Sequence, residues 1–218
     1  MELRQKKINF LGDSITEGHG VSCRENFFCN LLARDEGLAA ARNYGIGGTR
    51  IAPQHSRSGN NAWDQDFISR VEKMDPDADI IVVFGGTNDY GHGDAPIGYF
   101  TDSTPETFYG ALHTLIRKLY EKYPDKLIVF MTPTHRLREE SPRGDGYKQP
   151  TLPLSGYVDI IKEVCRYYSI PVLDLYANGS MQPSVECLKN LYMPDGLHPN
   201  DAGHRIIASR LAGFLKSL

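Results

Sequence analysis

The sequence lacks long hydrophobic runs, and it lacks an excess of charge of either sign. No apolar stretch approaches the roughly 20 residues that a transmembrane helix needs. Its 24 Lys and Arg residues nearly balance 27 Asp and Glu residues, which leaves a net charge of −3. Without a basic surplus, no strong attraction to nucleic acid or anionic lipid is expected. We therefore predict a protein that neither spans a membrane nor binds nucleic acid.

A signal peptide is also missing from the start of the chain. Met1 to Lys7 is charged and leads straight into an apolar run, with neither the apolar core nor the small-residue cleavage site of a secretory signal. A cytoplasmic location is the expectation that follows. The alternative of a mature secreted form, whose signal has been removed, stays open.

Cysteine is scarce, and its spacing indicates no metal site. Cys23, Cys29, Cys165 and Cys187 form no C-x-x-C pair, and no His-rich segment completes a zinc-finger spacing. We predict free thiols in a reducing compartment and no structural metal.

Strand-like and helix-like segments alternate along the whole chain. Ile80–Phe84 is continuously apolar, as expected of a central parallel strand covered on both faces. The 218 residues suffice for one domain, residues 1–218, with a sheet-based core. The alternation predicts an α/β sandwich around a parallel sheet. The predicted strands are Ile8–Leu11, Ala41–Tyr44, Ile80–Phe84, Leu127–Met131 and Val172–Asp174; the predicted helices are Phe27–Glu36, Trp63–Lys73, Pro105–Tyr123, Leu154–Tyr168 and Ala202–Lys216.

Two segments, Tyr90–Thr104 and His135–Pro153, show no apolar periodicity and are rich in Gly, Pro, Asp and Arg. Loops of this length inside a compact domain are usually functional. We expect both to lie near a binding site.

Polar residues follow each predicted strand at the point where it ends. In an open parallel sheet, ligands bind beyond the carboxyl ends of the strands. The polar segments therefore fall on one edge of the sheet. They are Ser14, Gly47-Gly48-Thr49, Gly85-Gly86-Thr87-Asn88-Asp89, His135-Arg136 and Asp195-Gly196-Leu197-His198.

Three of these residues have the chemistry of a serine hydrolase. Asp195 precedes His198 by three residues, so one short turn can present a carboxylate beside an imidazole and fix the ring's tautomer. Ser14 follows the first strand, where its hydroxyl can meet a substrate. Nucleophile, base and orienting carboxylate predict serine-dependent acyl transfer.

Acyl transfer also needs hydrogen-bond donors for a tetrahedral oxyanion. Asn88 offers a side-chain amide after the third strand, and Gly48 offers a backbone N–H without a Cβ in the way. The N–H of Ser14, at a predicted helix N-terminus, is a third donor. These three groups are the predicted oxyanion hole.

Across nearly the whole chain, the motifs resemble in order those of the SGNH hydrolases, also called GDSL esterases and lipases. The blocks are Gly12-Asp13-Ser14, with Ile15 in place of leucine, then Asn43-Tyr-Gly-Ile-Gly-Gly48, Gly86-Thr-Asn88-Asp89 and Asp195-Gly-Leu-His198-Pro199. The resemblance implies that Ser14 is the nucleophile, His198 the base and Asp195 its partner, with oxyanion donors from Ser14, Gly48 and Asn88. Gly45 and Gly47 are alternatives to Gly48. It also implies a flavodoxin-like three-layer α/β/α sandwich with a five-stranded parallel sheet, and no metal or organic cofactor.

Each motif also has a structural interpretation. Gly-Asp-Ser is a common turn, and Asn88-Asp89 could satisfy the backbone amides of its own turn. Asp195 could cap a helix, and Pro199-Asn200-Asp201 could simply start one. Their common order and common edge favour the functional interpretation.

Other basic residues compete for roles in the site. His204 falls on the last predicted helix, where we expect it to pack or to face solvent. His135 is a candidate substrate contact, although a surface histidine fits the pattern as well. Arg50, Arg136, Arg138 and Arg143 could recognise an anionic or hydroxylated substrate, but we expect solvated basic loops.

The expected function is an esterase that releases short acyl groups, such as acetyl, with a small-molecule or carbohydrate ester as substrate. The polar loops favour sugars over lipids. A lysophospholipase or thioesterase for longer acyl chains is the enzymatic alternative, and a flavodoxin-like binding domain is the non-enzymatic one. A homo-oligomer is compatible with the sequence.

Overall fold

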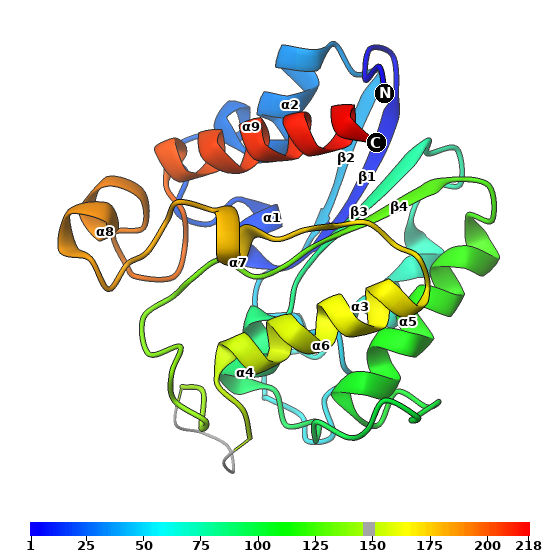
Figure 1. Cartoon of the computed structure of the whole chain (residues 1–218), viewed down its shortest axis with the longest axis vertical. Coiled ribbons are helices and arrows are strands. Elements are labelled where there is room, and N and C mark those ends of the chain that lie inside the picture. The colour runs from blue at the N-terminus through cyan, green and yellow to red at the C-terminus, as the bar shows by residue number, and fades with distance from the viewer. Residues whose placement is uncertain (146–150) are drawn as a thin grey trace.

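Five strands form one fully parallel sheet in the computed structural model, which describes residues 1–145 and 151–218 (Figure 1). The strand order is β2-β1-β3-β4-β5, the order of flavodoxin-like sheets. The strands are β1 Lys7–Gly12, β2 Ala40–Gly45, β3 Ile80–Phe84, β4 Leu127–Met131 and β5 Val172–Leu173. This arrangement confirms the predicted three-layer α/β/α fold.

Helices cover both faces of the sheet. Figure 1 shows α2 and α9 on one face and α3, α5 and α6 on the other. The helices are α1 Ser14–Glu17, α2 Phe28–Glu36, α3 Phe67–Arg70, α4 Thr87–His92, α5 Phe108–Lys122, α6 Leu154–Tyr167, α7 Leu175–Asn178, α8 Glu186–Tyr192 and α9 Asp201–Ser217, with 3₁₀ turns at Arg24–Asn26 and Val71–Lys73.

The central strand β3 divides the core into two parts. Ile81 and Val83 are buried in the cluster that includes α3, α5 and α6, whereas Ile80, Val82 and Phe84 are buried in the cluster that includes α2 and α9. Successive side chains of a strand point to opposite faces, so a strand covered on both sides must be apolar throughout. That is why the sequence of β3 has no polar alternation.

One predicted helix is much shorter in the structure. The sequence predicts a helix over Trp63–Lys73, but α3 begins only at Phe67 and continues as a 3₁₀ turn over Val71–Lys73. Asp66 ends the preceding loop because its side chain accepts a hydrogen bond from the backbone N–H of Ser69, 2.8 Å away. Trp63 therefore lies in a loop and is free to face the active edge of the sheet.

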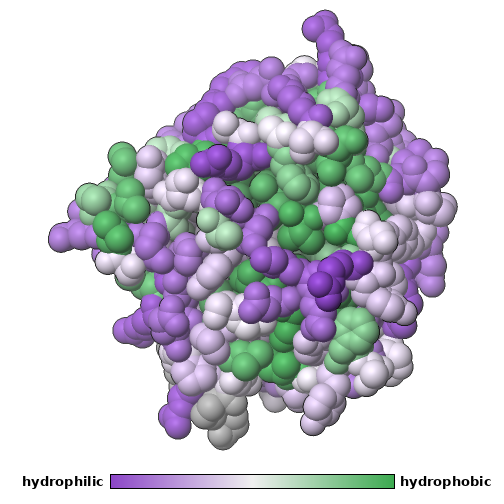
Figure 2. All heavy atoms as spheres, in the orientation of Figure 1, coloured by the Kyte–Doolittle hydropathy of each residue, from purple (hydrophilic) through white to green (hydrophobic). Residues whose placement is uncertain are grey.

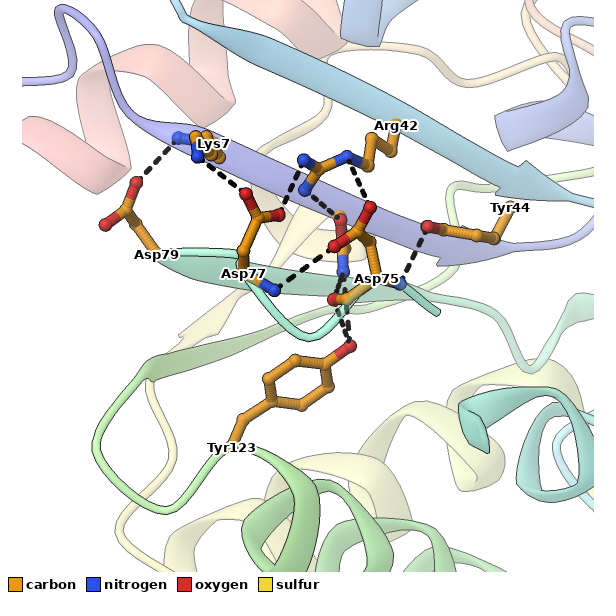
Figure 3. Close-up of polar contacts among 8 residues, drawn as sticks. Lys7, Arg42, Tyr44, Asp75, Asp77, Asp79 and Tyr123 are labelled. Carbon is orange, nitrogen blue, oxygen red and sulfur yellow. Dashed lines mark hydrogen bonds and ion pairs between the residues drawn. The ribbon is translucent and has the colours of Figure 1, made fainter. Parts of the chain in front are cut away.

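A polar network joins the strands at the opposite, amino-terminal edge (Figure 3). Asn9 on β1 is fully buried, and its amide donates to the backbone carbonyl of Asp75 and to the hydroxyl of Tyr123. Arg42 on β2 pairs with Asp75 and with Asp77. These contacts tie the segment before β3 and the end of α5 to the two strands. Lys7, Tyr44 and Asp79 complete the network.

A hollow of about 880 Å³ lies away from the active edge. It runs along β5 and is lined in part by Ile160, Ile170, Val172 and Leu218, and Figure 2 shows hydrophobic residues between α9 and α6 on this side. None of the predicted site residues lines it. Within the part of the chain that the structure describes, no helix is long and apolar enough to cross a bilayer.

Candidate active site

The polar segments that follow the strands meet at one cleft, as the sequence predicts. The cleft has a volume of about 400 Å³, and Ser14, Gly48, Asn88 and His198 all line it. They come from the ends of β1, β2 and β3 and from the turn before α9. Residues 184 positions apart in the sequence are thus brought into contact by the parallel sheet.

Ser14 is held at the start of a tight strand-to-helix turn. Asp13 caps α1, because its carboxylate accepts a hydrogen bond from the N–H of Ile15 at 3.0 Å. Gly12 must lack a side chain, since a Cβ there would lie 2.0 Å from the hydroxyl oxygen of Thr16. The turn leaves Ser14 6% exposed, with its side chain in the cleft.

Ser14, His198 and Asp195 form one hydrogen-bonded chain. The Oγ of Ser14 lies 3.0 Å from Nε2 of His198, and Nδ1 of the same ring lies 2.7 Å from Oδ2 of Asp195. A carboxylate only accepts hydrogen bonds, so Nδ1 is the protonated nitrogen and Nε2 presents its lone pair to the serine. This geometry suits the removal of a proton from Ser14.

Asp195 holds the turn as well as the ring. Its Oδ1 accepts hydrogen bonds from the N–H groups of Leu197 and His198, at 2.8 and 2.7 Å. Partial burial raises the pKa of Asp195, but the hydrogen bonds from His198 and Leu197 outweigh it and keep the pKa below its ordinary value. Asp195 is therefore ionised at neutral pH.

The structure separates the three glycines that compete as oxyanion donor. The N–H of Gly45 donates to the side chain of Asn43 at 2.8 Å, and the N–H of Gly47 donates to Glu17 at 2.7 Å. Within residues 1–145 and 151–218, no acceptor binds the N–H of Gly48. Gly48 is thus the glycine whose N–H is available to a substrate.

Asn88 and the backbone of Ser14 offer further donors to the cleft. Asn88 lies in the first turn of α4, 5% exposed, and one amide hydrogen is used in a bond to the carbonyl of Thr49 at 3.0 Å. That bond fixes the amide plane and leaves its second hydrogen for a ligand. The N–H of Ser14 is at the first position of α1, where helices leave N–H groups without an intrahelical partner.

Two aspartates beneath the cleft organise its loops. Asp89 accepts hydrogen bonds from the backbone N–H groups of Ile51 and Ala52, at 3.0 and 2.9 Å. Burial raises the pKa of Asp13 to about 7, although the Ile15 N–H and the nearby Arg70 lower it. Asp13 thus holds the turn that carries Ser14, whereas Asp89 holds the loop after β2 and not, as the sequence suggests, its own turn.

The Asp-x-x-His spacing also occurs at Asp89 and His92 and at Asp201 and His204, but with a different result. Asp89 is used by the backbone of the β2–α3 loop, and Nδ1 of His92 contacts the guanidinium of Arg50 at 2.8 Å. The spacing alone therefore does not distinguish a base from a structural histidine.

Two arginines that we expected on solvated loops are buried, so that prediction was wrong for them. Arg50 is 2% exposed and Arg136 is 7% exposed. Arg136 pairs with Asp145 at 2.5 Å, and both line the cleft. A buried arginine needs charged or hydrogen-bonding partners, and the sequence around each arginine does not show which residues these are. Arg138 and Arg143 are exposed, as predicted.

The remaining histidines are used in other ways. His135, predicted as a substrate contact, does not line the cleft; it bonds Glu139 at 2.7 Å and stacks on Tyr176 with ring centroids 4.0 Å apart. His204 packs inside the protein, where its Nδ1 accepts from the N–H of Phe28, and burial lowers its pKa to about 4.

Sequence reasoning missed several residues that border the cleft. Glu17, His19 and Trp63 line it, and the ring of His19 lies 5.3 Å from that of His198. His92, the last residue of α4, falls in the predicted loop Tyr90–Thr104, and the predicted loop His135–Pro153 contributes Arg136 and Asp145. Residues 146–150 of that second loop lie outside the described residues. Among those described, no three His, Cys, Asp or Glu side chains are grouped as metal ligands would be.

Comparisons with known proteins show the family and the fold to which the chain is similar. A family model for GDSL-like lipases and acylhydrolases matches residues 10–206. The crystal structure of a Lactobacillus plantarum protein is 33% identical, with 98% of both chains covered and a TM-score of 0.83. Curated protein sequences give no match.

Two more distant structures share the fold. A member of the lipolytic G-D-S-L family from Veillonella parvula is 20% identical, covers 97% of this chain and 99% of its own, and has a TM-score of 0.63. A two-domain esterase active on acetylated mannans, crystallised with mannopentaose, is 21% identical with a TM-score of 0.64. The match covers 97% of this chain and 49% of that esterase.

Proposed function

The chain belongs to the GDSL-like lipase/acylhydrolase family, and on that premise we propose that it is a serine esterase that cleaves short-chain carboxylic esters. The observation that supports this most strongly is the hydrogen-bonded chain from Ser14 through His198 to Asp195. A serine, a correctly oriented imidazole and an ionised carboxylate are the groups that acyl transfer through an acyl-enzyme requires.

In the proposed first step, the Oγ of Ser14 attacks the ester carbonyl carbon while its proton moves to Nε2 of His198. The resulting imidazolium is stabilised by Asp195, whose carboxylate contacts Nδ1. His198 then gives the proton to the departing alcohol oxygen as the carbon–oxygen bond breaks. Water, deprotonated by the same nitrogen, releases the acid and restores Ser14.

The negative oxygen of the tetrahedral intermediate needs donors that are in place before the reaction. We assign the N–H groups of Ser14 and Gly48 and the second amide hydrogen of Asn88 to this role. The Thr49 carbonyl supports the assignment of Asn88, because it holds the amide in one orientation. Gly48 is supported by the hydrogen bonds that occupy its neighbours' N–H groups.

We propose an acetyl or similarly short acyl group, carried by a carbohydrate. A cleft of about 400 Å³ is at the small end for ligand pockets, and charged and imidazole side chains such as Glu17, His19 and Arg136 border it. An esterase active on acetylated mannans shares this fold, so the architecture accommodates such a reaction. A lysophospholipase or thioesterase would need room for a longer acyl chain, which a cleft of this volume supports less well.

Hydrolysis of p-nitrophenyl esters from acetate to octanoate, with acetylated sugars as a second substrate set, tests this proposal. We expect the highest kcat/KM for the shortest acyl groups and release of acetate from acetylated sugars. A fluorophosphonate probe should label Ser14 in peptide mass spectrometry, and Ser14→Ala should abolish both labelling and turnover. An enzyme with no esterase activity and no labelled Ser14 contradicts the proposal and favours a binding domain.

A further inference from the structure

Trp63 is the only tryptophan in the chain, and it lines the cleft beside the proposed oxyanion hole. Its side chain is 42% exposed. A ligand in the cleft can therefore contact the indole. Its contacts with Gly48, Arg50 and His92 indicate its role.

The indole covers Gly48. A Cβ built on Gly48 would lie 2.4, 2.5 and 2.6 Å from Cδ1, Nε1 and Cγ of Trp63. Such nearly equal distances to three bonded atoms place that position over the face of the five-membered ring, not at its edge. The indole therefore lies over the backbone of Gly48, whose N–H we assign to the oxyanion hole. It leaves no room at this position for any residue larger than glycine.

A buried arginine holds Trp63 in this place. Arg50 donates one hydrogen bond to the backbone carbonyl of Trp63 at 2.7 Å and contacts Nδ1 of His92 at 2.8 Å. Asp64, next to Trp63, lies 3.5 Å from the same guanidinium. The ring of His92 lies against the indole, with centroids 5.3 Å apart and planes inclined by 34°. Backbone and ring are thus fixed together.

Trp63 and His198 line the cleft together with Ser14, and they belong to segments that cover opposite faces of the sheet. His198 precedes α9, which lies with α2 on one face, whereas Trp63 is in the loop that leads to α3 on the other (Figure 1). The leaving alcohol must be near His198, because that ring protonates it. The acyl substituent of the same carbonyl carbon therefore points away from His198, toward Trp63.

Resting on the proposed esterase function, we infer that Trp63 is the specificity-determining residue of the acyl side. Its immobilised indole closes that side of the cleft, so an acetyl group fits and longer chains meet the ring. Because Arg50 bonds its backbone and His92 packs against its ring, the residue is less mobile than a free surface tryptophan. The preference for short acyl chains thus comes from the position of Trp63 in the β2–α3 loop.

The test compares Trp63→Ala and Trp63→Phe with wild type on p-nitrophenyl acetate, butyrate, hexanoate and octanoate. Removal of the indole should raise the octanoate-to-acetate ratio of kcat/KM about tenfold or more, since methylene-sized changes in a pocket alter selectivity by that order. Trp63→Phe should fall between the two. Tyr99→Ala is the matched control, because Tyr99 is 78% exposed and lies outside the cleft; its chain-length profile should equal that of wild type.

The single tryptophan offers a second readout that does not depend on turnover. A p-nitrophenyl methylphosphonate places a methyl group on the acyl side when the Oγ of Ser14 displaces p-nitrophenolate from phosphorus. We expect this adduct to change the emission of Trp63. We also expect the labelling rate to fall with longer alkyl groups in wild type but not in Trp63→Ala.

Each outcome separates this inference from the function on which it rests. Wild type that hydrolyses esters and is labelled at Ser14, while Trp63→Ala keeps the wild-type chain-length profile, overturns the inference alone. A fall in the octanoate-to-acetate ratio in Trp63→Ala also overturns the inference, because Trp63 would then contact the long acyl chain favourably. So does a rise in the KM for acetylated sugars alone, because Trp63 would then contact the alcohol part of the substrate. Wild type that is inactive and unlabelled overturns both.

Discussion

Asp195 contacts His198 twice, once at the ring through Oδ2 and once at the backbone N–H through Oδ1, both at 2.7 Å. One carboxylate thus shapes the turn that carries the histidine and also sets which ring nitrogen is protonated. Position and tautomer are coupled in a four-residue segment. The short Asp195–His198 segment therefore presents a correctly oriented imidazole to Ser14, although the two lie at opposite ends of the chain.

The first prediction concerns that double contact. Asp195→Asn keeps an oxygen that can accept from the backbone of Leu197 and His198, so the turn should survive. Its amide, however, donates to Nδ1 and favours the wrong tautomer. We expect kcat to fall by about 10⁴-fold with little change in melting temperature, in line with the same change in serine proteases. Steady-state kinetics and thermal unfolding of one preparation measure both, and a near-normal kcat would refute the role.

The second prediction is that Asn88 stabilises the transition state. Asn88→Ala should lower kcat by about 10²–10³-fold while KM changes little, because a neutral carbonyl gains less from the amide than an oxyanion does. Asn88→Asp should be worse, since it places negative charge at the oxyanion. If Asn88 only anchors the loop at Thr49, the variant should instead lose thermal stability and keep its kcat in the folded fraction.

The third prediction uses two glycines with similar positive φ angles. Gly48 and Gly59 have φ values of +74° and +82°, but a Cβ on Gly59 meets nothing within 4 Å. In both Ala variants the left-handed conformation should lower the unfolding free energy by about 1–2 kcal/mol. Only Gly48→Ala forces the indole of Trp63 aside, so only it should lose activity, by at least tenfold. Equal kinetics for the two variants would contradict the proposed packing.

The fourth prediction follows from the buried Asp13, whose pKa burial raises from 3.8 to about 7. Between those values the unfolded chain releases its proton and the folded protein keeps it, so this group lowers stability as pH rises through that range and has no further effect above it. Asp13→Asn keeps an acceptor for Ile15 and removes the titration. Relative to wild type, the variant should gain roughly 2–3 kcal/mol of unfolding free energy between pH 5 and pH 8. Denaturant titrations at both pH values give this difference, and parallel pH profiles would contradict it.

The fifth prediction concerns the polar network at the far edge of the sheet. Asn9→Ala removes an amide that donates to Asp75 and Tyr123 and should lower the unfolding free energy by about 1–3 kcal/mol. The esterase kinetics should not change, because the network includes Lys7 at the start of β1 (Figure 3), whereas Ser14 follows the end of that strand. Asn178→Ala, at an exposed site on α7, is the control and should stay within about 0.5 kcal/mol of wild type.

The sequence by itself determined the sheet and the order of its motifs. Ile80–Phe84 could be identified as a central strand because burial on both faces demands an unbroken apolar run. The serine, asparagine and histidine segments could be assigned to one edge because parallel strands place all their carboxyl ends there. Asn200 could be predicted as the cap of the last helix, and it accepts from the N–H groups of Ala202 and Gly203. Each of these features depends on residues close together in the chain.

Only the tertiary structure decided which glycine has a free N–H, which arginines are buried and where Trp63 lies. Gly48 is distinguished from Gly47 by Glu17, thirty residues earlier. The burial of Arg50 depends on His92, forty-two residues later. A local pattern shows a residue's type but not its partners, and the free energy of a buried charge or amide is set by those partners. The fold was therefore readable from periodicity, whereas the details of the cleft required long-range contacts.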